Sequence, residues 1–227
     1  MTEAPPRGNA VVAIPAFNEA PQLANVIRGC RLVGLEIWVV DDGSTDGTGE
    51  IARREGAEVL RHERNLGKGA AIRTALTRFL ASEWRSLVFM DADGQHDPRF
   101  VADFLRVGAA ADLVLGNRMA NPGPMPLVRR WTNLAMSRLL EWVCGVPIPD
   151  SQCGYRLLSR RFAEAFHPTT VHFELESEML VQAARLGFRI GEVSIPTVYG
   201  RAPSHIRPIR DTLRFLYFLL KTTLLPR

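Results

Sequence analysis

Ser86-Leu87-Val88-Phe89-Met90-Asp91-Ala92-Asp93-Gly94-Gln95-His96 is the most informative stretch of this chain. Its first half is an apolar run typical of a buried strand, and its second half brings two carboxylates, an amide oxygen and an imidazole. Hard divalent cations such as Mg²⁺ and Mn²⁺ prefer oxygen ligands and often share them with phosphates. Because open α/β sheets bind ligands outside the carboxyl ends of their strands, we expect a metal site here, with an Asx-rich turn as the alternative.

Apolar and amphipathic segments alternate on both sides of this stretch. Their periodicity predicts strands at 10–14, 36–40, 57–60, 87–90 and 113–115, and helices at 21–33, 48–55, 69–80 and 98–110. This order predicts an α/β fold with a mostly parallel central sheet and helices on both of its faces.

A proline-rich connection at 121–126 leads into a more helical part of the chain. There we expect amphipathic helices at 127–143 and 174–186, a loop at 146–156 and a strand at 190–198. Residues 206–225 combine basic side chains with the apolar run 215–220, which favours a helix lying in a membrane interface. A terminal helix packed on the domain is the alternative.

The composition is ordinary for a globular protein, with 46% hydrophobic and 23% charged residues among 227. The formal charge is only +4 and no aromatic-basic recognition motif occurs, so we expect no nucleic-acid partner. Three scattered cysteines without a CxxC pair predict neither a zinc site nor a disulfide framework and favour a reducing compartment. No signal peptide or membrane span is predicted, so we expect a cytoplasmic protein.

Acidic residues follow three of the predicted strands: Glu19, Asp42, and Asp91 with Asp93. Carboxylates alone would repel a phosphorylated ligand, so a cation has to mediate, and a sugar nucleotide fits this arrangement. Pro15 and Ala16 can border a base, and Glu19 can bind a base or ribose, although helix capping explains the Asn18-Glu19 pair equally well.

Asn65-Leu66-Gly67-Lys68-Gly69 precedes a predicted helix. The spacing is not that of a P-loop, and no strand leads into GxGxxG, so dinucleotide binding is disfavoured. Gly67 and Lys68 can still reach a phosphate at the helix N-terminus.

The motifs together resemble those of family 2 glycosyltransferases of GT-A fold, in the dolichyl- or polyprenyl-phosphate mannose and glucose synthase branch. The segments in question, in chain order, are AIPAFNE, VVDDGSTDGT, NLGKGAAIRTA, VFMDADGQHDP, GNRM, DSQCGYRLLSR and FELESEMLVQAARLGFRIGEVSIP. The resemblance implies an inverting transfer from a nucleotide sugar, with Mg²⁺ or Mn²⁺ at Asp91, Asp93 and Gln95. It also implies nucleotide contacts at Pro15, Phe17, Glu19 and Asp42.

The chain also departs from some of these relatives. They carry transmembrane helices after the catalytic domain, whereas this sequence stops at Arg227, so we expect a peripheral protein at the inner face of the membrane. Gly94 stands where many relatives have a larger apolar residue, which leaves the donor sugar open.

The acceptor is expected to be a lipid phosphate, which needs no general base because it is already anionic at neutral pH. It does need cations, and basic or polar side chains follow the fifth strand and surround the predicted helices. The residues expected to bind its phosphate are Arg118, Arg129, Arg130, Asn133, Arg156, Arg201 and Ser204. The residues expected to be catalytic are Asp91, Asp93 and Arg118. For any single arginine, a solvated surface charge is the alternative.

Three further polar residues carry weaker hypotheses. Asp150 can orient the turn at Arg156 or an acceptor arginine, and Glu176 can act as a base if the acceptor is a hydroxyl. His96 can support the metal ligands or form a hydrogen-bonded turn.

We therefore expect a metal-dependent hexosyltransferase that moves glucose or mannose from UDP or GDP to a polyprenyl phosphate. The expected single domain has a nucleotide-sugar half at 10–118, an acceptor half at 119–205 and a membrane-interface helix at 206–227. Transfer to a hydroxyl of a glycan or small molecule, and a catalytically silent sugar-nucleotide scaffold, are the alternatives.

Overall fold

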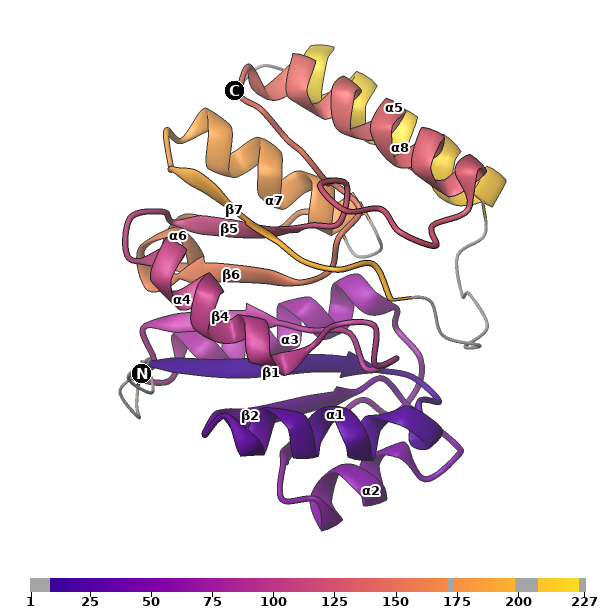
Figure 1. Ribbon diagram of the computed structural model, residues 1–227, viewed down its shortest axis with the longest axis vertical. Coiled ribbons are helices and arrows are strands. Elements are labelled where there is room, and N and C mark those ends of the chain that lie inside the picture. The colour runs from indigo at the N-terminus through magenta and orange to yellow at the C-terminus, as the bar shows by residue number, and fades with distance from the viewer. Residues whose placement is uncertain (1–8, 171–173, 199–207, 225–227) are drawn as a thin grey trace.

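The computed structural model describes residues 9–170, 174–198 and 208–224, with side chains of the last helix described from 214 to 223. Within these ranges one seven-stranded sheet has the order β3-β2-β1-β4-β6-β5-β7 (Figure 1). Its strands are β1 (Ala10–Ala16), β2 (Glu36–Asp41), β3 (Glu58–Arg61), β4 (Ser86–Phe89), β5 (Leu113–Asn117), β6 (Arg156–Ser159) and β7 (Ile190–Ser194). Only β6 runs antiparallel to its neighbours β4 and β5 in this described sheet.

Helices cover both faces of the sheet. They are α1 (Ala20–Leu32), α2 (Thr48–Arg54), α3 (Lys68–Leu80), α4 (Val101–Gly108, after a 3-10 turn at Pro98–Phe100), α5 (Leu127–Cys144), α6 (Arg160–Ala165), α7 (Glu174–Arg185) and α8 (Pro208–Leu224). Helices α1, α2 and α4 pack on one face, and α3, α6 and α7 on the other. Helices α5 and α8 lie beside α7, at the end of the molecule drawn at the top of Figure 1.

The apolar runs in the sequence follow from this burial on both faces. In β1, Val11 and Ala13 join one hydrophobic core, whereas Val12 and Ile14 join the other. Successive side chains of a strand point to opposite faces, so a strand covered on both sides has to be apolar throughout. The predicted α/β fold with a mostly parallel sheet is confirmed.

The sequence interpretation missed the antiparallel strand. Residues 146–155 form the expected loop, but Arg156 is the first residue of β6, and the short helix α6 follows β6 directly. The apolar part of β6 is only Leu157 and Leu158, too short for periodicity to reveal. The last predicted strand is also shorter than expected, because β7 ends at Ser194.

The terminal helix α8 divides its apolar residues between two environments. Phe215, Phe218 and Leu219 are buried in the core, as a helix packed on the domain requires. Leu216 and Tyr217 remain 46% and 69% exposed on the same helix. Among the described residues, no helix has the length and apolar character needed to cross a bilayer.

Candidate active site

The chain after β1 turns sharply and is held by the loop after β2. Asn18 has a φ of 56°, a left-handed conformation that asparagine tolerates better than most residues. Its backbone N–H donates to Ser44 Oγ at 3.0 Å, and the N–H of Glu19 donates to Thr48 Oγ1 at 2.9 Å. Glu19 is thereby fixed at the edge of the sheet where β1, β2 and β4 end.

Glu19 faces other carboxylates at this edge. Burial, followed by the negative charges of Asp93, Asp91 and Asp46, raises the pKa of Glu19 to about 7. The contribution of these three acidic neighbours means that an additional positive charge would be stabilised between the carboxylates.

The predicted metal ligands Asp91, Asp93 and Gln95 form an all-oxygen donor set at this place, which suits Mg²⁺ or Mn²⁺. The turn that carries them is closed by a hydrogen bond from the Gln95 N–H to Asp93 Oδ1 at 2.9 Å. In the described part of the chain, no three carboxylate, imidazole or thiol groups already form a metal-binding cluster. The donor chemistry and the repulsion at Glu19 therefore fit a divalent cation, but the side chains have to rearrange to bind it.

Asp91 is paired with a lysine. Lys68 Nζ, at the start of α3, lies 2.7 Å from Asp91 Oδ1 and 3.2 Å from Glu176 Oε1 on α7. Burial alone would raise the pKa of Asp91, but the positive charge of Lys68 holds it well below its usual range. Pro15 and Gly154 line the same narrow pocket.

Gly154 allows the backbone of the loop before β6 to approach this ion pair. A Cβ atom at this position would lie 2.6 Å from Asp91 Oδ2 and 2.8 Å from Lys68 Nζ. Any side chain here would displace both groups. Glycine is therefore required at this position, because the backbone passes so close to the two charged groups.

Asp42 positions the loop that delivers Lys68. Its buried carboxylate accepts hydrogen bonds from the N–H groups of Leu66 (2.9 Å) and Gly67 (2.8 Å), and His62 Nδ1 lies 2.7 Å away. Gly67, the residue directly before α3, has a φ of 96°, a conformation that suits glycine. The nucleotide contact predicted for Asp42 is thus joined by a structural role that the sequence did not suggest.

His96 forms the hydrogen-bonded turn that was one of its two expected roles. Its Nδ1 accepts from the N–H of Asp91 at 3.1 Å, and its ring stacks on Tyr155 with 5.0 Å between centroids. Burial lowers the pKa of His96, which favours the neutral ring that this acceptor nitrogen requires.

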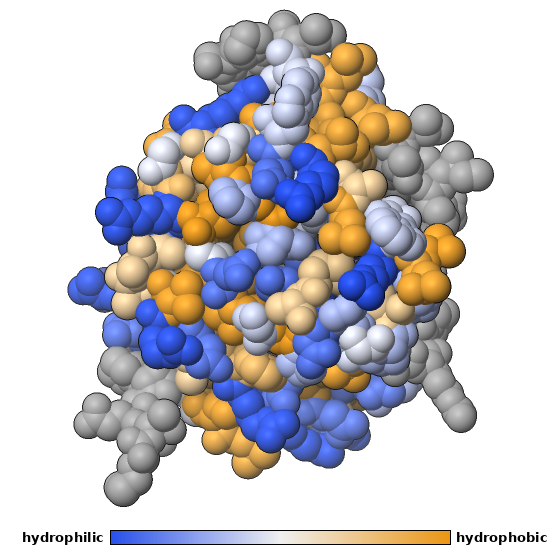
Figure 2. Space-filling model, turned by 45° about the horizontal axis from the view of Figure 1, so that its top comes forward, coloured by the Kyte–Doolittle hydropathy of each residue, from blue (hydrophilic) through white to orange (hydrophobic). Residues whose placement is uncertain are grey.

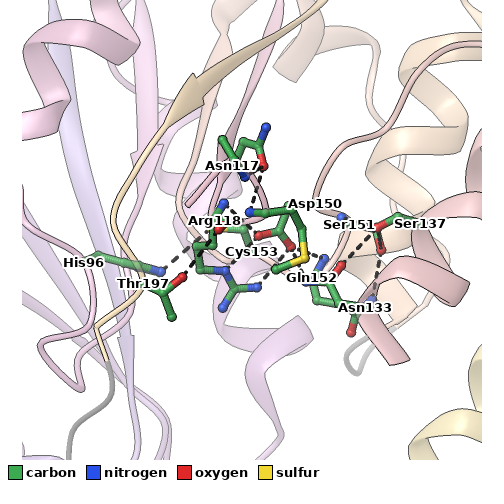
Figure 3. Close-up of polar contacts among 12 residues, drawn as sticks. His96, Asn117, Arg118, Asn133, Ser137, Asp150, Ser151, Gln152, Cys153 and Thr197 are labelled. Carbon is green, nitrogen blue, oxygen red and sulfur yellow. Dashed lines mark hydrogen bonds and ion pairs between the residues drawn. The ribbon is translucent and has the colours of Figure 1, made fainter. Parts of the chain in front are cut away.

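Arg118, at the end of β5, is held by Asp150 (Figure 3). Its Nε and Nη2 donate to the two carboxylate oxygens at 2.8 and 3.0 Å. Asn133 Nδ2 donates to the same carboxylate at 2.7 Å from the buried side of α5. Burial alone would lower the pKa of Arg118, but its acidic surroundings, including Asp150 and Asp91, raise it above its usual range. Asp150 therefore orients Arg118, and the role of this arginine at an acceptor stays a prediction.

Arg156 does not reach the place predicted for it. The side chain is 1% exposed, and its guanidinium donates to the backbone carbonyls of Cys153, Ser151 and Glu176. Instead of facing an acceptor, it ties the loop before β6 to the start of α7. Asn133, 4% exposed, is likewise turned inward onto Asp150 and supports Arg118.

Comparison with known proteins identifies the family. Residues 11–166 match the model of the glycosyl transferase family 2. The chain belongs to glycosyl transferase family 2.

Two curated relatives are members with named acceptors. A UDP-N-acetylglucosamine–dolichyl-phosphate N-acetylglucosaminyltransferase of Methanococcus voltae is 30% identical over 82% of this chain and 84% of its own. An undecaprenyl-phosphate mannosyltransferase of Micrococcus luteus is 32% identical over 82% of each chain.

A solved structure confirms the GT-A fold. The glucosyl-3-phosphoglycerate synthase of Mycobacterium tuberculosis, crystallised with Mn²⁺, UDP-glucose and phosphoglyceric acid, superposes with a TM-score of 0.72. It is 25% identical, and the match covers 96% of this chain and 79% of that one.

Of the remaining site residues predicted for this glycosyltransferase, four lie within the described part of the chain and two lie outside it. Ala16 is buried, whereas Phe17 is partly exposed beside it, and Arg129 and Arg130 lie on the exposed side of α5. Arg201 and Ser204 lie outside the described residues.

Sequence reasoning missed Gly154 and His62 in this family 2 enzyme. No local pattern marks either residue, because each acts on a partner that is distant in the sequence.

Proposed function

We propose that this glycosyltransferase transfers glucose or mannose from UDP or GDP to a polyprenyl phosphate with inversion, and that it depends on Mg²⁺ or Mn²⁺. The observation that carries the proposal is the convergence of Glu19, Asp91 and Asp93 at one sheet edge, with Arg118 next to them. Acidic groups suited to a cation thus lie next to a basic group suited to the phosphate of the acceptor.

The donor occupies the acidic edge. Glu19 and Asp42 contact the nucleoside, Pro15 and Phe17 border the base, and the start of α3 at Lys68 faces the diphosphate. Asp91, Asp93 and Gln95 hold the cation, which when bound stabilises the charge of the leaving diphosphate.

The acceptor phosphate binds at Arg118. Asp150 fixes the guanidinium through two hydrogen bonds, so the arginine is preorganised to hold an anion in attack geometry. A phosphate oxygen needs no deprotonation to attack. Glu176 is already engaged by Lys68, so it serves as a counterion better than as a general base. The two relatives named for dolichyl and undecaprenyl phosphate support this acceptor class.

The lipid part of the acceptor requires a membrane, and one end of the molecule suits it. Apolar side chains on α5 and α8 are exposed there, and we call them the α5–α8 surface. Its residues are Leu127, Val128, Trp131, Trp142, Leu216, Tyr217 and Leu220. Figure 2, with this end turned forward, shows hydrophobic and hydrophilic residues side by side on it. Exposed tryptophan next to arginine is typical of surfaces that enter a membrane interface.

A transfer assay tests the proposal. The purified protein is incubated with Mn²⁺, labelled UDP-glucose or GDP-mannose, and undecaprenyl phosphate in detergent, and the lipid is then extracted into organic solvent. We expect label in the organic phase from one donor, abolished by EDTA. Donor consumption that never yields a labelled lipid would overturn the acceptor assignment.

A second candidate is transfer to a hydroxyl of a small molecule. The likeness to a synthase crystallised with phosphoglyceric acid favours it, because that acceptor also carries a phosphate. The same assay with phosphoglyceric acid in place of the lipid distinguishes the two, since label then stays in the aqueous phase as a new anionic sugar.

A further inference from the structure

We infer that Lys68 and the divalent cation compete for Asp91, and that Glu176 shifts this competition in favour of the cation by giving Lys68 a second partner. The inference rests on the proposed metal at Asp91 and assigns a positioning role to two residues outside the metal ligands. It concerns how strongly the cation binds, and it can be measured without any sugar transfer.

The ammonium group lies between two carboxylates that come from different elements. Its distances to Asp91 Oδ1 and Glu176 Oε1 are 2.7 and 3.2 Å, so a small side-chain rotation transfers it from one to the other. Lys68 is 22% exposed and Glu176 13%, so neither charge has full access to water.

The backbone around Lys68 limits how far the ammonium can move. The backbone of Gly154 is so close that a Cβ there would lie 2.8 Å from Nζ. On the other side, Arg156 binds the carbonyl of Glu176 and fixes the start of α7. Lys68 therefore has only Asp91 and Glu176 as charged partners among the contacts described.

A cation bound by Asp91 cannot share the same oxygen with an ammonium group at hydrogen-bond distance, because like charges repel strongly in a partly buried site. Lys68 then has to leave Asp91, and an unpaired buried charge is unfavourable. Glu176 provides the displaced ammonium group with a negatively charged partner. Without Glu176, the lysine would remain on Asp91 and oppose the cation.

Mn²⁺ binding measured by electron paramagnetic resonance tests this, on the full chain with and without UDP. In the protein without UDP, Lys68→Met should bind Mn²⁺ at least about threefold more tightly than wild type, and Glu176→Gln at least about threefold more weakly. Lys68→Arg keeps the charge and should stay near wild type, which controls for a change in packing.

The double variant Lys68→Met/Glu176→Gln separates the two possible actions of Glu176. If Glu176 acts through Lys68, the double variant should match Lys68→Met within about twofold, because coupled residues are not additive. A Glu176→Gln effect that persists without the lysine would overturn the role of Glu176. Thermal melting of every variant confirms that each is folded.

The remaining outcomes are also distinct. Wild type that binds Mn²⁺ with the same affinity as Lys68→Met overturns the competition and leaves the proposed function standing. Wild type that binds no Mn²⁺, with or without UDP, overturns the proposed metal site and this inference together.

Discussion

The carboxylates at the ends of β1 and β4 and the arginines near β5 and β6 are used in opposite ways. Glu19 lies close to Asp91 and Asp93, and its burial together with their negative charges raises its pKa to about 7. Arg118 and Arg156, by contrast, are bound by the protein itself, one by the carboxylate of Asp150 and the other by three backbone carbonyls.

This difference shows when residue type is a guide to function. A group of like charges is unfavourable unless a ligand neutralises it, so the crowded carboxylates point to a ligand. Arg156 is 1% exposed and its guanidinium is bound by three backbone carbonyls, which points to a structural role, whereas Arg118 keeps 19% of its side chain exposed. Substituting one of these carboxylates or arginines at a time tests the contrast.

The largest effect is expected from Asp93→Asn. Loss of one predicted metal ligand should reduce kcat at least about 100-fold, while the melting temperature stays constant or rises because repulsion at Glu19 is relieved. Steady-state kinetics and differential scanning fluorimetry measure the two. Asp103→Asn, on the exposed side of α4, is the control and should keep full activity. An active Asp93→Asn enzyme would remove Asp93 from the metal site.

Arg156→Met should lower the free energy of unfolding by about 3 kcal/mol or more, because three buried carbonyls lose their donors. Urea denaturation measures this. Arg130→Met, at an exposed position on α5, should change stability by less than about 0.5 kcal/mol. If Arg156→Met were equally stable but had a raised KM for the acceptor, the original prediction of an acceptor contact would be restored.

Glu19→Gln tests the raised pKa of Glu19 through the pH dependence of stability. Folded wild type keeps a proton on Glu19 between the ordinary pKa of 4.5 and its raised value of about 7, whereas the unfolded chain has lost it. Wild-type stability therefore falls across this interval and is constant above it. The melting temperature of the variant relative to wild type should thus be unchanged near pH 4.5 and rise to a plateau above pH 7.

These melting curves are recorded in EDTA so that no cation screens the carboxylates. Glu83→Gln, at an exposed position, is the control. A difference between Glu19→Gln and wild type that is the same at every pH would contradict the charge repulsion.

The smallest effect concerns the α5–α8 surface. Trp131→Ser with Trp142→Ser should weaken binding to anionic lipid vesicles about tenfold, with no loss of stability, because both side chains are mostly exposed. Sedimentation with vesicles measures it. Leu32→Ser removes an exposed apolar residue from α1, far from this surface, and should leave vesicle binding unchanged. Equal losses in both variants would make the effect nonspecific.

The sequence predicted the carboxylates at the sheet edge better than the surroundings of Arg156, for physical reasons. Strand ends of a parallel sheet meet at one edge, so local patterns were enough to bring Glu19, Asp91 and Asp93 together. The antiparallel pairing of β6 depends on contacts between segments that are distant in the sequence, and the periodicity of a single segment does not reveal such contacts. The role of Arg156 follows from that pairing and was therefore missed. Polar Asn133 faces inward on α5 while Trp131 faces out, which reverses the usual pattern of an amphipathic helix.

Strand β6 also sets the distance between the two halves of the proposed site. It is bonded to β4, which leads to Asp91, and to β5, which ends at Asn117 just before Arg118. Two strand spacings, roughly 10 Å, thus separate the strands that lead to the proposed donor and acceptor groups. If the proposed reaction is correct, the sheet fixes the distance between these groups whatever lipid is bound. Under that proposal, lengthening or shortening the hydrocarbon tail should alter how often a lipid arrives and leave the rate of the transfer step unchanged.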